Sequence, residues 1–330
     1  MRIEVSRSPE DFIKLKRPWQ NLLEKSVVST PFQTIEFQKE WWAHFGVGEL
    51  RLICVYDEND LVGIASMYVD PEDVLRWVGG EDIADYHDVI VSEKNASVVR
   101  KVVIDWLSGP QSEDWRSADL VNVPEWSGSV SHLQELSLAQ GWKVETRIGT
   151  VCPQLVLPDN FVSYLAVLDG KQRREIRRKL RRADAEGASA VFVTNPSNQY
   201  LEIQEFITLM ESSGKDKAAF LDSKMRNPYI NILQSMQDSG LLQLCFLRLG
   251  DHNLASYAYF SMGDTLYLYN SGYDVSQYAA LSPGWVLLAK LFDYAIKTGH
   301  KRFDFMRGNE DYKYKFGGED VSLIQLIINR

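Results

Sequence analysis

One segment near the end of this 330-residue chain restricts the possible folds more than any other part. An apolar stretch from Trp285 to about Thr298 has helical spacing, and Pro283 and Gly284 stand at its start. Proline is preorganised for the first helical position, and glycine allows a ligand to approach the backbone. A helix start also presents unbonded N–H groups and a positive dipole end, which suit a phosphate. The segment predicts either an anion-binding helix start or an ordinary strand–helix–strand unit punctuated by Pro and Gly.

The rest of the pattern predicts an α/β chain. Helical spacing near the N-terminus precedes a hairpin across Asp57–Asp60, and helices then alternate with strands. The second half repeats this order, with three consecutive strands that are turned at Gly250–Asn253 and at Gly263–Asp264. We therefore expect two domains, residues 1–155 and 156–330, which share an order of elements without a visible sequence repeat.

The order of motifs in the second half resembles a known family. The residues concerned are Ser282-Pro283-Gly284, Phe303-Asp304-Phe305, Arg307-Gly308 and Tyr312-Lys313. They resemble the CelD-like branch of the GNAT superfamily of acyl-CoA N-acyltransferases, which is similar in architecture to the Fem-type aminoacyltransferases. The resemblance implies two tandem GNAT-like domains with mixed, mostly antiparallel sheets flanked by helices.

The same resemblance implies an enzyme that moves an acyl group from acetyl-CoA, or another acyl-CoA, to an amine. The amine is expected on an amino sugar or a polysaccharide precursor, held in a cleft between the domains. GNAT enzymes hold the CoA pyrophosphate at a strand–loop–helix junction, which here assigns donor binding to the second domain. The predicted donor-binding residues are Ser282, Pro283, Gly284, Trp285, Lys313 and Lys315.

The polar segment after residue 303 supplies the predicted catalytic residues. Strand alternation sets Asp304 on the face opposite its two Phe neighbours, where a carboxylate can act as a base toward an amine. Glu310 is the alternative base, and Tyr312 takes the role of protonating a leaving thiolate that a Tyr often has in GNAT enzymes. Arg307 and Asn309 are predicted to contact the acceptor. The alternatives are a structural carboxylate at Asp304 and a surface loop held by its own salt bridges.

The roles of two further clusters are not decided by the sequence. Lys171–Arg182 has eight basic residues in twelve and predicts an amphipathic helix. Its basic face is expected to contact an anionic donor, an acidic glycan, lipid headgroups or tRNA, and the alternative is a solvated surface with no ligand. Asp85 and His87 in the first half are assigned to the acceptor side, because alternation puts only these two possible ligands on one face. No metal is expected.

Composition excludes several other classes. Residues 1–155 carry 15 Lys and Arg against 25 Asp and Glu, so a duplex nucleic-acid partner is not expected. The three cysteines are scattered, and there is no signal-peptide core or membrane-length apolar run. The chain is interpreted as cytoplasmic. The alternatives for function are a Fem-type transferase that uses aminoacyl-tRNA, favoured by the basic helix, and a non-catalytic accessory protein of exopolysaccharide biosynthesis, favoured by the short loop before Gly284.

Overall fold

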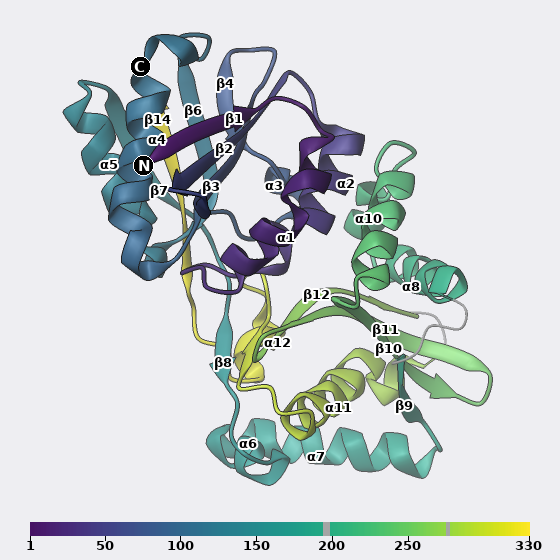
Figure 1. The fold of residues 1–330 in the computed structure, drawn as a ribbon. Coiled ribbons are helices and arrows are strands. Elements are labelled where there is room, and N and C mark those ends of the chain that lie inside the picture. The colour runs from purple at the N-terminus through teal and green to yellow at the C-terminus, as the bar shows by residue number, and fades with distance from the viewer. Residues whose placement is uncertain (194–198, 275–277) are drawn as a thin grey trace. The chain divides into compact units, whose positions relative to one another are not determined.

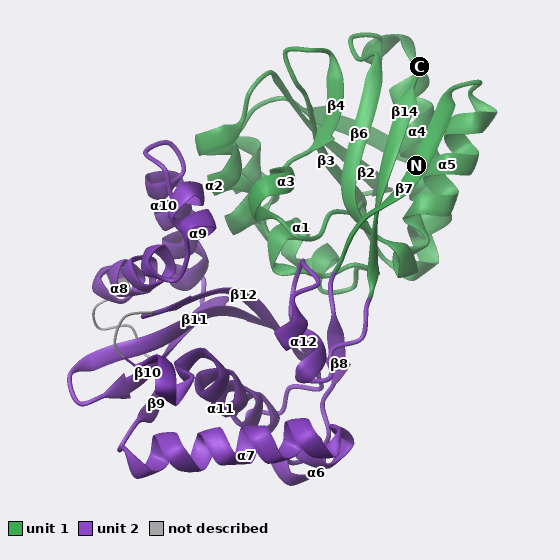
Figure 2. Ribbon diagram, turned by 180° about the vertical axis from the view of Figure 1, so that it is seen from behind, with its two compact units in different colours: residues 1–151, 321–330 green, residues 152–320 purple. Residues whose placement is uncertain are grey.

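The computed structural model describes residues 1–193, 199–274 and 278–330. The chain forms two compact α/β units, of which unit 1 comprises Met1–Val151 with Val321–Arg330 and unit 2 comprises Cys152–Asp320 (Figure 2). In the described part of the chain, no helix is long and apolar enough to cross a membrane.

Unit 1 is built on an eight-stranded sheet in the order β1-β2-β3-β4-β6-β14-β7, with β5 paired to β3. Helices α1 and α2 lie on one face of this sheet, and α4 and α5 lie on the other (Figure 1). The elements are β1 Arg2–Ser6, α1 Asp11–Leu23, η1 Pro31–Gln33, α2 Ile35–Phe45, β2 Glu49–Asp57, β3 Asp60–Val69, β4 Val74–Trp77, α3 Gly80–Ile83, β5 Ile90–Val91, η2 Glu93–Asn95, α4 Ala96–Ser108, η3 Pro110–Ser112, β6 Ser117–Pro124, η4 Glu125–Ser127, α5 Ser129–Ala139, β7 Lys143–Val151 and β14 Ser322–Asn329.

The last strand of the chain belongs to the sheet of the first unit. β14 lies between β6 and β7 and pairs antiparallel with both of them. Residues 321–330 therefore belong to unit 1, whereas the sequence predicted that they form part of the second domain, residues 156–330. Side-chain alternation alone does not reveal which sheet a strand joins, because it reports the two faces and not the neighbours.

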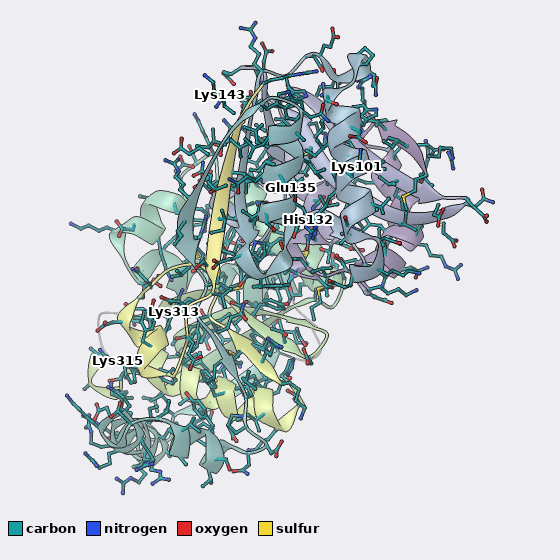
Figure 3. The ribbon with its side chains drawn as sticks, turned by 90° about the vertical axis from the view of Figure 1, so that its left-hand side faces the viewer. Lys101, His132, Glu135, Lys143, Lys313 and Lys315 are labelled. Carbon is teal, nitrogen blue, oxygen red and sulfur yellow. The ribbon has the colours of Figure 1, made fainter. Side chains whose placement is uncertain are left out.

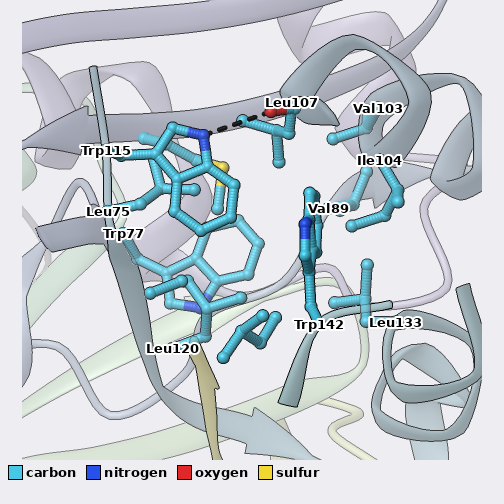
Figure 4. A pocket seen from close by; sticks show the side chains of 13 residues that line it. Leu75, Trp77, Val89, Val103, Ile104, Leu107, Trp115, Leu120, Leu133 and Trp142 are labelled. Atoms are coloured by element: carbon cyan, nitrogen blue, oxygen red, sulfur yellow. Dashed lines mark hydrogen bonds between the residues drawn. The ribbon is translucent and has the colours of Figure 1, made fainter. Parts of the chain in front are cut away.

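The core of unit 1 is rich in tryptophan. Trp115 and Trp142 pack edge to face at 5.1 Å between ring centroids, and Trp115 Nε1 donates to the carbonyl of Leu107 at 3.2 Å. These side chains, together with Trp77, line a small apolar cavity (Figure 4). Its lining carries no converging polar groups, so the cavity is part of the packed core and is not a substrate site.

Unit 2 is built on a six-stranded sheet in the order β8-β13-β12-β11-β10-β9. Helix α11 covers one face and is itself covered by α6 and α7, whereas α8 and α10 lie on the other face (Figure 1). The elements are β8 Gln154–Val156, α6 Phe161–Val167, α7 Gly170–Ala185, β9 Ser189–Val193, α8 Gln199–Ser212, α9 Lys215–Phe220, α10 Arg226–Asp238, β10 Leu242–Leu249, β11 His252–Met262, β12 Thr265–Tyr273, η5 Ala279–Leu281, α11 Pro283–Lys297, β13 Arg302–Asp304 and α12 Asp311–Lys315.

β12 and β13 are parallel neighbours that soon separate. They pair only from Thr265 with Arg302 to Tyr267 with Asp304, although β12 continues to Tyr273. On its other edge β12 stays paired with β11, with one extra residue, Tyr269, at a bulge. Among the residues that the structure describes, no strand therefore covers this edge in the later part of β12.

A stack of aromatic rings fixes α11. The ring of Phe292 lies between Tyr164 of α6 and Phe303 of β13, with centroid distances of 4.5 and 4.0 Å. Phe305 and Phe316 pack around the same ring, and all five side chains are buried. The alternation predicted for residues 303–305 is thus present, since both Phe side chains face α11.

We expect Phe292→Ala to lower the free energy of unfolding by about 3–5 kcal/mol, because it removes a buried ring from contacts on several sides. Urea unfolding followed by circular dichroism measures this loss. Val162→Ala, at a side chain 67 % exposed on α6, is the control and should change stability by no more than about 0.5 kcal/mol. Equal effects of the two substitutions would contradict the role given to the stack.

Candidate active site

The start of α11 has the features of an anion site. Ser282 precedes the helix in a left-handed conformation, with φ 52° and ψ 56°, and its side chain does not cap the helix. The first helical bond runs from the Val286 N–H to the Ser282 carbonyl at 3.1 Å. Pro283 has no N–H, so the N–H groups of Gly284 and Trp285 have no partner within the helix. They can donate to an anion.

A cation lies beside this helix start. Lys179 of α7 donates from Nζ to the Ser282 Oγ at 2.9 Å and stands over the Trp285 ring, 4.4 Å from its centroid. Burial is the largest influence on the pKa of Lys179 and lowers it, the carboxylate of Glu175 at 3.7 Å opposes this shift, and the charges of Arg178 and Lys315 lower the pKa further. The structure thus brings Lys179 and Lys315 to the same region as Ser282. Spacing did not single out Lys179, since it is one of eight basic residues in its segment.

Two tyrosines of the sheet border the helix start. Tyr257 donates its hydroxyl to the Gly284 carbonyl at 3.2 Å. A Cβ atom added to Gly284 would stand 3.7 Å from that hydroxyl and 4.0 Å from the Tyr273 ring, so the glycine is not required for packing. Burial raises the pKa of Tyr257, and the neighbouring phenol of Tyr312 adds to the shift.

Tyr312 is a half-buried phenol next to the same tyrosine. Burial raises its pKa, and the carboxylate of Glu310 raises it further. A phenol with a raised pKa stays protonated at neutral pH, so Tyr312 has a proton to donate. This state is the one that the predicted role of acid requires.

Lys313 holds the loop between β13 and α12. Its side chain, labelled in Figure 3, is buried. Nζ donates to the carbonyls of Met306, Arg307 and Gly308 at 3.0, 2.7 and 3.1 Å and also pairs with Glu310 at 2.9 Å. An ammonium group has three protons, and these three carbonyls and the carboxylate share them. We therefore assign Lys313 to shaping this loop, which differs from the predicted contact with the donor.

The carboxylate of Asp304 also forms hydrogen bonds that stabilise this loop. Its side chain is only 2 % exposed, and it accepts from the Met306 N–H at 2.7 Å and from Gln154 Nε2 at 3.0 Å. Met306 has φ 61°, a conformation that a non-glycine residue adopts at a cost. The carboxylate stabilises that turn, which supports the structural alternative for Asp304 over the predicted base.

The remaining predicted residues of the loop are more accessible. Glu310 is 59 % exposed at its side chain and forms an ion pair with Lys313. Lys315 forms an ion pair with Asp311 at 2.9 Å, Arg307 is half-buried, and Asn309 is exposed. Of the two predicted carboxylates, Glu310 is the one that can meet a ligand.

The predicted amphipathic helix is present as α7. Ile176 and Ala183 are buried, whereas Arg174, Arg177, Arg178 and Arg181 are exposed at helical spacing and form what we call the arginine stripe. Arg178 pairs with Glu175 at 2.8 Å. Among the described residues, no carboxylate lies within ion-pair distance of the other three guanidinium groups.

A family model matches part of the second unit. Residues 170–314 are similar to the acetyltransferase (GNAT) domain, and the match covers less than half of the chain. It begins with α7 and ends within α12, so it contains the helix start, Lys179 and the loop around Lys313. The second unit therefore contains the segment that is similar to an acetyltransferase domain, as the sequence motifs predict.

Solved structures show that the likeness extends over the whole chain. FemX superposes with a TM-score of 0.69 at 12 % identity, over 98 % of this chain and 97 % of that one. A tandem GNAT protein from the clavulanic acid biosynthesis pathway gives 0.52 at 9 % identity, over 98 % of each chain. L-PGS from Bacillus licheniformis gives 0.61 at 10 % identity, over 98 % of this chain and 92 % of that one. These likenesses confirm the tandem GNAT-like fold.

No match to this sequence was found among curated proteins.

Asp85 and His87 lie in unit 1, where both side chains are buried. The His87 N–H donates to the Asn122 carbonyl at 3.0 Å, and His87 Nδ1 lies 3.3 Å from the Val121 carbonyl. Within the described residues, no three His, Cys, Asp or Glu side chains are grouped as metal ligands would be. The contacts of His87 with β6 give this residue a structural explanation, and an acceptor role for Asp85 and His87 stays a proposal.

The two carboxylates of the loop should differ in what they stabilise. We expect Asp304→Asn to cost about 1–3 kcal/mol, because the new amide would turn N–H groups toward the Gln154 donor. Glu310→Gln should cost about 1 kcal/mol or less, since its ion pair is exposed. Thermal and urea unfolding of the two near-isosteric variants compares them directly. A larger loss for Glu310→Gln would reverse the assignment.

Proposed function

We propose that unit 2 transfers an acyl group from acetyl-CoA, or another acyl-CoA, to an amine. The observation that carries this proposal is the start of α11 within the GNAT domain. There the unbonded N–H groups of Gly284 and Trp285 lie beside the ammonium of Lys179. Backbone donors and a cation at a helix start suit a pyrophosphate. The acyl-CoA supplies an activated thioester.

The residues around this helix start suit the two proton movements of the reaction. When the amine nitrogen bonds to the acyl carbon and the carbon–sulfur bond breaks, the nitrogen loses a proton and the sulfur gains one. Glu310 is the proposed acceptor of the first proton, because its carboxylate is exposed. Tyr312 is the proposed donor of the second, because its raised pKa keeps the phenol protonated.

The acceptor is proposed to be an amino sugar or a polysaccharide precursor in the cytoplasm. Arg307 and Asn309 follow β13 in the same unit and are the proposed acceptor contacts. Acyl transfer in such a site depends mainly on positioning and on stabilising developing negative charge.

The arginine stripe favours a second candidate. Fem-type enzymes use aminoacyl-tRNA. Three guanidinium groups that have no carboxylate partner in the described part of the chain suit the phosphates of a nucleic acid. The stripe lies on the exposed side of α7, away from the buried residues that face α11. A non-catalytic accessory role in exopolysaccharide assembly is the third candidate, which applies if neither donor binds.

Gly284→Glu should weaken acetyl-CoA binding at least about tenfold, or about 1.4 kcal/mol, because it adds a carboxylate to an anion site. Isothermal titration calorimetry measures the affinity. Gly284→Ala is the matched control and should bind normally, because its Cβ meets nothing closer than 3.7 Å. Unchanged affinity in a folded Glu variant would place the donor elsewhere.

Two charge variants separate the candidate donors. Lys179→Gln should weaken acetyl-CoA binding about tenfold, whereas glutamine at all four positions of the arginine stripe should leave that affinity nearly unchanged. An aminoacyl-tRNA donor predicts the reverse: the stripe variant loses tRNA affinity and its salt dependence, and Lys179→Gln has little effect. Glutamine at four exposed lysines of unit 1 is the control for net charge, with the set Lys25, Lys94, Lys101 and Lys143.

A further inference from the structure

Lys217 is a half-buried amine with a fixed position. It lies on the short helix α9, and its Nζ donates to both the carbonyl and the hydroxyl of Ser271, the latter at 2.9 Å. Ser271 is in β12, four residues beyond Tyr267, where the pairing with β13 ends. Since β11 covers the other edge of β12, we infer that Lys217 reaches the edge that β13 leaves uncovered.

Several contacts connect Lys217 to the start of α11. Ser271 stands directly opposite Tyr257, whose hydroxyl bonds to the Gly284 carbonyl. Opposite residues of an antiparallel pair point to the same face of the sheet. The charge of Glu310 acts on both Lys217 and Tyr312. The amine therefore belongs to the same group of side chains as the proposed donor site.

The amine is also easily deprotonated. Burial lowers the pKa of Lys217 to about 8, although the carboxylate of Glu310 opposes this shift. Asp216 and Lys215 on the same helix are exposed, so water screens their charges. A neutral amine is a nucleophile, whereas an ammonium is not. Near pH 8 about half of the molecules present Lys217 in the reactive form.

We propose that Lys217 is a site of self-acylation by the donor bound at the start of α11. The Nζ lone pair bonds to the acyl carbon, the carbon–sulfur bond breaks, and the proton lost from nitrogen ends on the CoA thiol. The product is an uncharged amide with a single N–H, which can keep only one of the two hydrogen bonds that Lys217 donates to Ser271. This inference rests on the proposed function, because it needs an acyl-CoA in unit 2.

The test uses acetyl-CoA as the probe and compares two lysines of one helix. The intact protein is incubated with acetyl-CoA at several pH values, and peptide mass spectrometry follows acetylation of Lys217 and Lys215. We expect Lys217 to react at least about tenfold faster, because a bound donor has a high effective concentration. Its rate should rise with pH and level off above about 8. Lys215 is exposed and reports reaction with free acetyl-CoA.

Two variants complete the test. Gly284→Glu should remove the advantage of Lys217 while leaving Lys215 unchanged, since only the first depends on a bound donor. Lys217→Arg should lose the modified peptide and still bind acetyl-CoA in calorimetry. Equal rates at the two lysines, in protein that binds acetyl-CoA, would overturn this inference and leave the proposed function standing. Absence of acetyl-CoA binding would overturn both.

Discussion

The packing of rings around Phe292 determines the geometry on which the rest of unit 2 depends. Tyr164 of α6, Phe303 of β13 and Phe316, which follows α12, all contact this ring. Tyr164 adds a polar contact, because its hydroxyl donates to the Phe316 carbonyl at 3.0 Å. Rings that interlock in this way allow little sliding, since protein interiors are as closely packed as organic crystals. The helix start at Ser282 is consequently held in one position relative to β13 and α12.

A second constraint comes from charges that are buried close to that helix. Lys313 and Asp304 each satisfy backbone groups in residues 306–308, so the chain there adopts a conformation that neither helix nor strand propensity would give. A buried charge is tolerated only when it is paired or hydrogen-bonded. The loop and its two ionic residues therefore stabilise each other. The more exposed Glu310 and Tyr312 follow directly after this stabilised segment.

The sequence was sufficient to predict the helices and strands that depend on a local hydrophobic pattern. The apolar periodicity after Pro283 predicts a helix at 284–298, and α11 spans Pro283–Lys297. The amphipathic spacing of α7 and the alternation of Phe303 with Asp304 were predicted for the same reason. The functions of the ionic residues were harder, because Lys179, Lys217 and Lys313 resemble other lysines until tertiary contacts are known. Helix α12 lies in a segment predicted as a loop, since its five residues are too few to show a period.

The place of β14 has a consequence for how the chain is made. β14 pairs with β6 on one edge and with β7 on the other, yet it comprises Ser322–Asn329, at the very end of the sequence. Domains in most chains can fold in the order in which the ribosome releases them. Here the sheet of unit 1 lacks an inner strand until Ser322–Asn329 has been synthesised, whereas Cys152–Asp320 is by then already complete as a segment. Unit 2, although it is made after most of unit 1, is therefore the unit that can reach its final fold first, and the facing edges of β6 and β7 remain open until β14 is made.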